Sequence, residues 1–187
     1  MGAARPLPPS ADIGPGGQSV AEKKSSSRGQ KYEPENLKLV IVTGSPPASG
    51  LYFYGLLGKI SEPLFAALMR QIACSPSCKE EGLAELRRKG WLLVDATYEQ
   101  VDKSKRQDET IVRDYPLLCE DLTRLSPDKA VPLVLVKANV CRLLGPRLQA
   151  DGFKVVNKGR DVYFPSHGNQ SKFHQQFSAL TRSDHAA

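Results

Sequence analysis

Apolar residues along this chain form short, almost wholly apolar runs that are separated by longer segments with helical periodicity. Such runs predict strands that are buried on both faces of a sheet, because an exposed face would require polar residues at every second position. Four of them are expected as strands, at residues 37–43, 91–94, 132–136 and 154–157.

The segments between these runs carry apolar residues three or four positions apart, which predicts helices with one buried face. In the first, Ser61 can cap the helix and Pro63 suits its first turn. Gly90 ends the second after a basic turn, and Pro116 predicts a kink or a break into two helices in the third. The expected helices are 61–73, 80–89, 108–125, 139–150 and a last one that carries Phe173 and Phe177.

Strands that alternate with helices predict an α/β fold. We expect a single three-layer domain with a central, mainly parallel four-stranded sheet flanked by helices. Ligands of such sheets bind at the carboxyl ends of the strands, so the loops after Thr43, Val94, Val136 and Asn157 are the places to seek a site.

The chain has 187 residues, enough for one domain and a tail. Residues 1–35 are rich in Pro, Gly and Ser and are expected to be a disordered tail, with the domain at 36–180 and a disordered C-terminus at 181–187. No secretory signal or membrane-spanning run is evident, so we expect an intracellular, soluble protein of the cytoplasm or nucleoid, or of the nucleus in a eukaryote.

The net charge of +6 and the pI near 9.2 favour polyanionic partners, although a solvated surface explains the spread of these charges equally well. The four cysteines are too few for a disulfide scaffold. Cys74 and Cys78 form a C-x3-C pair that does not match the spacing of common metal sites, so we expect no metal and no cofactor.

Three polar motifs follow the expected strands. Gly44-Ser-Pro-Pro47, with aromatic residues soon after it, follows the first strand; Asp95-Ala-Thr97 follows the second; and Phe164-Pro-Ser-His-Gly-Asn169 precedes the last helix. In this order the motifs resemble the uracil-DNA glycosylase superfamily, from about Leu37 to Phe177. The resemblance implies a DNA base-excision repair enzyme that flips uracil, or another deaminated base, out of DNA and hydrolyses its N-glycosidic bond. It implies DNA as the partner, no cofactor and a monomer.

The resemblance also implies roles for individual residues. Gly44, Pro46, Phe53, Tyr54 and Asp95 would bind the base, with Phe53 stacking on it. The alternative is that these aromatic side chains only cover the end of the sheet, and that Asp95 only caps the turn after its strand.

His167, Asp95 and Ser45 would form the catalytic group, with His167 stabilising the departing base. Contact with a phosphate or capping of the last helix is the alternative for His167. Ser166, Gly168, Asn169 and Lys137 would bind DNA phosphates, because amide groups at a helix amino terminus attract anions.

Three departures from the family pattern leave other functions open. No carboxylate lies between Gly44 and Pro47, Asp95 stands where an amide often reads the base, and Phe164 stands where a catalytic histidine is common. Two alternatives follow: a catalytically weak DNA-binding protein on the same fold, or an unrelated α/β nucleotide-binding enzyme.

Overall fold

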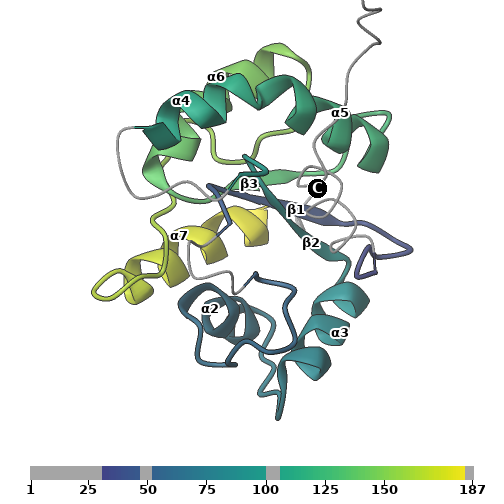
Figure 1. Cartoon of the computed structure of the whole chain (residues 1–187), viewed down its shortest axis with the longest axis vertical. Coiled ribbons are helices and arrows are strands. Elements are labelled where there is room, and N and C mark those ends of the chain that lie inside the picture. The colour runs from purple at the N-terminus through teal and green to yellow at the C-terminus, as the bar shows by residue number, and fades with distance from the viewer. Residues whose placement is uncertain (1–30, 47–51, 100–105, 184–187) are drawn as a thin grey trace, which may run out of the picture.

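The computed structural model describes residues 31–46, 52–99 and 106–183. Within these ranges the chain forms a parallel sheet covered by helices on both faces (Figure 1). The elements are β1 (Leu39–Thr43), α2 (Pro63–Gln71), α3 (Lys79–Lys89), β2 (Trp91–Asp95), α4 (Arg106–Arg113), α5 (Tyr115–Leu125), β3 (Leu133–Leu135), α6 (Ala138–Ala150) and α7 (Gln170–Ser183).

The predicted α/β class is confirmed, but the four-stranded sheet is not: the described residues form three strands in the order β2-β1-β3. The expected fourth strand, 154–157, contributes only an isolated parallel bridge between Val155 and Leu133. Asn157, two residues after Val155, bonds to β3 through its side chain and not through its backbone. The Asn157 amide accepts a hydrogen bond from the Leu135 N–H at 2.8 Å and donates one to the Leu135 carbonyl at 2.9 Å. The side chain thus occupies the β3 edge that a continuing strand would need.

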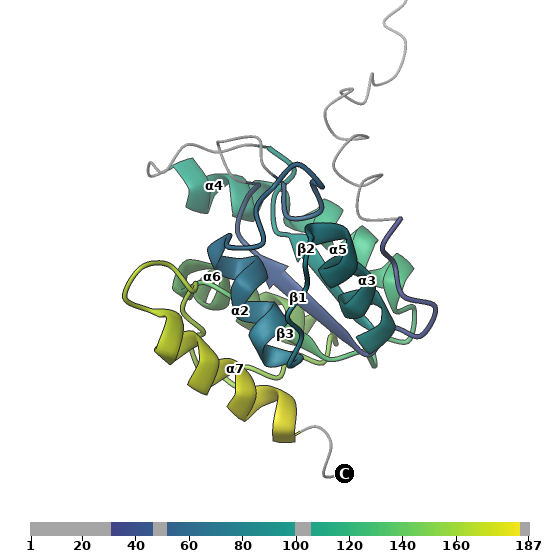
Figure 2. The same ribbon diagram turned by 90° about the horizontal axis from the view of Figure 1, so that it is seen from below.

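Alternate residues of β1 point to opposite faces of the sheet, where each joins a different hydrophobic cluster. Leu39 and Ile41 pack with α2, α3 and α7, whereas Val40 and Val42 pack with α4, α5 and α6. All five residues of β1 are buried, as expected for a central strand. Figure 2, turned by 90°, shows the helices on either side of the sheet.

Most helix boundaries agree with the sequence signals. Gly90 ends α3 with φ of 83°, a left-handed conformation that glycine adopts without strain. The predicted break is confirmed, since α4 and α5 are separate and Pro116 lies in the first turn of α5. The expected cap at Ser61 is wrong: α2 starts one residue later, with Glu62 at the capping position. The Glu62 side chain instead pairs with Lys79.

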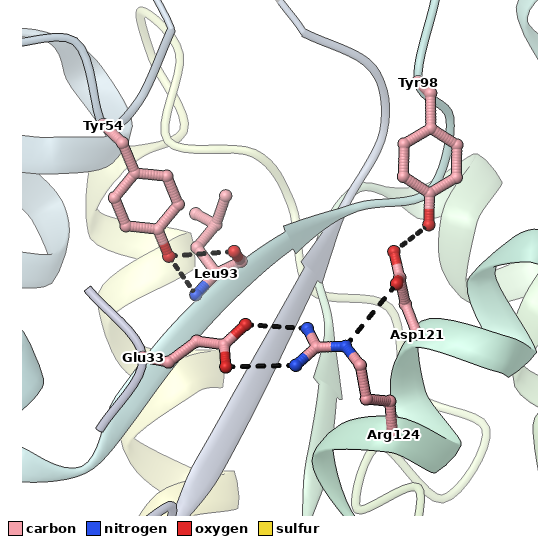
Figure 3. A network of polar contacts seen from close by, with 6 residues as sticks. All are labelled: Glu33, Tyr54, Leu93, Tyr98, Asp121 and Arg124. Atoms are coloured by element: carbon pink, nitrogen blue, oxygen red, sulfur yellow. Dashed lines mark hydrogen bonds and ion pairs between the residues drawn. The ribbon is translucent and has the colours of Figure 1, made fainter. Parts of the chain in front are cut away.

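The packed part of the domain begins before the predicted boundary at residue 36. Tyr32 is buried and its ring stacks on Tyr54 at 5.5 Å between centroids. Glu33 binds Arg124 of α5 through both carboxylate oxygens, at 2.7 and 3.1 Å (Figure 3). At the other end, α7 continues through Ser183, past the expected boundary at residue 180. The rest of both predicted tails, residues 1–30 and 184–187, lies outside the described residues.

Among the described helices, none has the combination of length and apolar character that crossing a bilayer requires.

Candidate functional site

The order of the strands creates a topological switch point at the carboxyl edge of the sheet. The chain leaves β1 toward α2 on one face, but it leaves the neighbouring strand β3 toward α6 on the other face. Open α/β sheets bind their ligands at such a switch point. Here the switch point lies between the residues that follow Thr43 and those that follow Leu135.

A chain of hydrogen bonds joins the two sides of this switch point. The Lys137 ammonium group donates to Gln107 Oε1 at 2.5 Å, and Gln107 Nε2 donates to Ser45 Oγ at 2.8 Å. Gly44 lies against both side chains: a Cβ at that position would lie 3.3 Å from Gln107 Nε2 and 3.5 Å from Lys137 Cδ, so a larger residue there would shift the Gln107 amide by a few tenths of an ångström. Since the Ser45 oxygen accepts this bond, its own hydrogen is available to a ligand.

The backbone of Lys137 is strained. Its φ is 92°, a region that a residue with a Cβ adopts at a cost of about 1–3 kcal/mol. The conformation is held by a hydrogen bond from the Lys137 N–H to the Val162 carbonyl at 2.7 Å. Burial lowers the pKa of the Lys137 amine, and Asp108 partly opposes this effect. Backbone strain and a shifted side-chain pKa are both common in residues that bind a ligand.

Asn139, two residues after Lys137, adds a buried polar atom. Its Nδ2 donates to Asp108 Oδ1 at 2.7 Å, and its Oδ1 is buried without a partner among the described residues. Asp108 is also the partner of Arg142, at 2.7 Å.

Asp95 lies at the carboxyl end of β2, directly opposite Thr43 in the register of β1. Thr43 Oγ1 donates to Asp95 Oδ1 at 2.7 Å. Part of the residue's surface is exposed, but the carboxyl group is buried, and burial raises the pKa of Asp95 to about 6 despite the opposing hydrogen bond from Thr43. A carboxyl group with this pKa changes protonation close to neutral pH, as acid–base catalysis requires.

Backbone hydrogen bonds join the loop after β2 to the loop after β1. The Ala96 N–H donates to the carbonyls of both Thr43 and Gly44 at 2.9 Å, and the Thr97 N–H donates to the Gly44 carbonyl at 3.2 Å. Asp95 therefore adjoins the Gly44 loop, as the predicted site requires. Pro46, the next predicted residue of that loop, is buried, and residues 47–51 lie outside the described ranges.

The aromatic residues after that loop lie against the helices. The half-buried ring of Phe53 contacts Tyr54 edge-on at 5.1 Å and Phe65 of α2 at 5.9 Å between centroids. The Tyr54 hydroxyl donates to the Leu93 carbonyl at 2.9 Å and accepts from the Leu93 N–H at 2.8 Å, on the outer edge of β2 (Figure 3). With its hydroxyl engaged there and its ring stacked on Tyr32, Tyr54 stabilises the edge of the sheet, and we leave it out of the base-binding group.

The last motif forms a turn at the amino terminus of α7. Ser166, His167 and Gly168 are exposed and Asn169 is half-buried. The turn is closed by a hydrogen bond from the Asn169 N–H to the Ser166 carbonyl at 2.9 Å, and Gly168 has φ of 85°.

Within the described ranges, no hydrogen bond or ion pair joins this turn to Asp95 or Lys137. The segment before the turn does reach Lys137, whose N–H donates a hydrogen bond to the Val162 carbonyl.

Gln107 is the site residue that sequence reasoning missed. It lies in α4, far along the chain from both Ser45 and Lys137, and no local pattern distinguishes it from the solvent-facing residues of a helix.

The described residues contain no group of three or more His, Cys, Asp or Glu side chains placed to hold a metal ion. All four cysteines, Cys74 and Cys78 included, are free thiols. Comparison with known proteins finds no family model and no curated protein that matches this chain. Its function must therefore be argued from its own residues.

Proposed function

We propose that this protein is a DNA glycosylase that hydrolyses the N-glycosidic bond of uracil, or of another deaminated base, in DNA. The observation that carries the proposal is the buried Asp95 carboxyl group, bonded to Thr43 and adjoining the Gly44 loop at the carboxyl edge of the sheet. A nucleobase everted from the duplex needs a narrow site with few side chains at its entrance and a polar group at its closed end.

In the reaction, a water molecule attacks the C1′ carbon of the deoxyribose as the bond between C1′ and the base nitrogen breaks. The bonding electron pair leaves with the base, and the attacking water loses a proton. Asp95 in its ionised form accepts that proton, supplying the carboxylate that the Gly44–Pro47 loop lacks. His167 donates a hydrogen bond to the departing base and so stabilises its negative charge.

Other residues would position the DNA. Phe53 stacks on the base, an interaction that contributes about 1–3 kcal/mol. Ser45, oriented by Gln107, donates to the substrate, and Lys137 places positive charge beside the sugar and its phosphates. Ser166, Gly168 and Asn169 offer backbone and hydroxyl groups to a phosphate at the start of α7.

The test is release of uracil from a labelled oligonucleotide that contains a single uracil, followed by alkali to cut the strand at abasic sites. We expect wild-type protein to yield the cleaved strand. Asp95→Asn should lower the single-turnover rate by about 100-fold or more, the usual effect of removing a general base. His167→Ala should lower it by about tenfold or more, as expected when stabilisation of the leaving base is lost.

Asp128→Asn is the matched control, because Asp128 is an exposed carboxylate in the loop before β3. Full activity of both Asp95→Asn and His167→Ala would refute the assigned roles. Salt-dependent DNA binding by the wild type without base release above a protein-free control would favour a DNA-binding protein instead.

A further inference from the structure

A cavity of about 290 Å³ lies at the amino edge of the sheet, opposite the edge that carries the proposed site. The first residues of two strands, Leu39 of β1 and Trp91 of β2, line this cavity, as does Pro132 directly before β3. β2 runs from Trp91 to Asp95, and a strand rises about 3.3 Å per residue, so the cavity lies about 13 Å from Asp95. We call it the amino-edge cavity.

The lining of the amino-edge cavity is largely apolar. Leu39 and Leu180 are buried there, and Val156 is half-buried. The half-buried ring of Trp91 packs on Phe177 of α7 at 5.6 Å between ring centroids, which holds the ring against the core. The volume is close to that of the smallest ligand sites, about 300 Å³, and it suits one aromatic or branched apolar side chain.

Basic side chains complete the lining. Lys38, Arg88 and Lys89 are all exposed, and no Asp or Glu is among the described residues that line the cavity. Backbone hydrogen bonds bring these cations together from two elements. The carbonyl of Gly90, directly after Lys89, accepts from the Lys38 N–H at 2.8 Å and from the Leu39 N–H at 3.1 Å.

Local partners leave much of this positive charge unbalanced. Arg88 donates to the Glu85 carboxylate at 2.6 and 3.0 Å, and this pair is neutral. Among the described residues, neither Lys38 nor Lys89 forms an ion pair. The carboxyl end of α3 contributes about half a negative charge, which is less than the charge of these two lysines together. The amino-edge cavity is therefore an apolar site beside net positive charge.

We propose that the amino-edge cavity binds an acidic peptide segment of a partner protein, which inserts one aromatic or branched apolar side chain beside Trp91. Carboxylates that flank this side chain meet Lys38 and Lys89. Buried aromatic anchors carry much of the binding energy of protein interfaces, and complementary charge selects and orients the partner.

The charge of this chain and the shape of DNA argue against two other occupants. The net charge of +6 makes a second copy of the chain a poor partner for a basic surface. A DNA backbone offers phosphates but no side chain that fills the cavity. The inference goes beyond the proposed function and does not depend on it, because the two sites lie at opposite edges of the sheet.

The test uses an acetylated and amidated hexapeptide of sequence DEEFED, with DEEAED as the matched peptide. Trp91 is the only tryptophan of the chain, so its fluorescence reports occupation of the cavity, and titration calorimetry measures the affinity. Lys38→Glu and Lys89→Glu reverse charges in the lining. Lys172→Glu is the control, because it changes the net charge equally from the amino-terminal end of α7, about 12 Å along that helix from Leu180.

We expect DEEFED to change the Trp91 fluorescence saturably, with a Kd below about 1 mM, and DEEAED to leave it unchanged. Lys38→Glu and Lys89→Glu should each weaken DEEFED binding about tenfold, since an attractive charge becomes a repulsive one. Lys172→Glu should stay within about twofold of the wild type, because it lies beyond the screening length of about 10 Å at 0.1 M salt.

Three results would overturn the proposal. DEEFED does not bind or binds without a change in Trp91 fluorescence; DEEAED binds equally well, so that charge alone accounts for the contact; or Lys89→Glu and Lys172→Glu bind DEEFED with the same affinity. Displacement of DEEFED by uracil-free duplex DNA, with its own effect on Trp91, would identify a nucleic-acid surface instead. Base release from uracil-containing DNA is measured separately, so failure of the proposed function leaves these outcomes unchanged.

Discussion

Replacing Glu62 by Ala tests the energetic contribution of the ion pair between Glu62, just before α2, and Lys79, at the start of α3. The change leaves the Lys79 ammonium group in a site that is 1% exposed, with the Tyr52 carbonyl at 3.3 Å as its remaining hydrogen-bond partner among the described residues. Removing one partner of a buried ion pair costs about 3–5 kcal/mol. Glu62 itself is 24% exposed, so water can enter the vacated space. We therefore expect the free energy of unfolding to fall by the lower figure, about 3 kcal/mol.

For a domain of this size, that loss lowers the melting temperature by about 6–12 °C. Guanidinium denaturation gives the free energy of unfolding directly. The protein has a single tryptophan, Trp91, which packs on Phe177 at 5.6 Å between ring centroids. Its fluorescence reports the core beneath α7 and lies outside the altered loop.

Glu85→Ala serves as the control, because Glu85 pairs with Arg88 in an exposed i,i+3 contact on the surface of α3. Its unfolding midpoint should match that of the wild type, since exposed pairs contribute little. The reasoning is refuted if Glu62→Ala unfolds at the same midpoint as Glu85→Ala. A Cβ at Gly58 would lie 2.1 Å from Glu62 Oε1 and 2.6 Å from Lys79 Nζ, so Gly58→Ala should disturb the same pair. The cost of Gly58→Ala should therefore be much smaller in the Glu62→Ala background than alone.

Two further predictions concern the carboxyl edge and the core. Burial raises the pKa of Asp95 to about 6, so the folded protein binds the proton more tightly than the unfolded chain, and stability should fall as pH rises from about 4 to 6. Asp95→Asn should keep the acceptor for Thr43 and abolish this pH dependence. It should raise the free energy of unfolding at pH 7 by about 3 kcal/mol, as measured by denaturation at pH 4.5 and 7.5. An unaltered pH profile would contradict the burial argument. Gly82→Ala should destabilise the protein by about 1–3 kcal/mol, because a Cβ there would lie 2.5 Å from Phe65 and 2.7 Å from Met69. An unchanged unfolding midpoint would show that α2 and α3 can separate without cost.

Local patterns predicted three of the four expected strands correctly, and they also predicted the edge of the sheet at which Asp95 and the Gly44 loop lie. The apolar run at 37–43 has no polar face, so it predicted a strand that is buried on both sides. Gly90 and Pro116 act through backbone conformation, and both mark the boundaries that they predicted. Because parallel strands present their carboxyl ends at one edge, the order of motifs also brought Asp95 next to the Gly44 loop.

Only the tertiary structure decided which side chains meet. The Gln107 amide lies between Ser45 and Lys137, the Glu62 carboxylate supports a loop instead of capping its helix, and the Asn157 amide takes the place of a fourth strand. The pKa of Asp95 likewise depends on how much protein surrounds the carboxyl group. Each of these outcomes joins segments far apart in the chain and depends on side-chain position at the scale of a hydrogen bond, which the local alternation of apolar and polar residues does not encode.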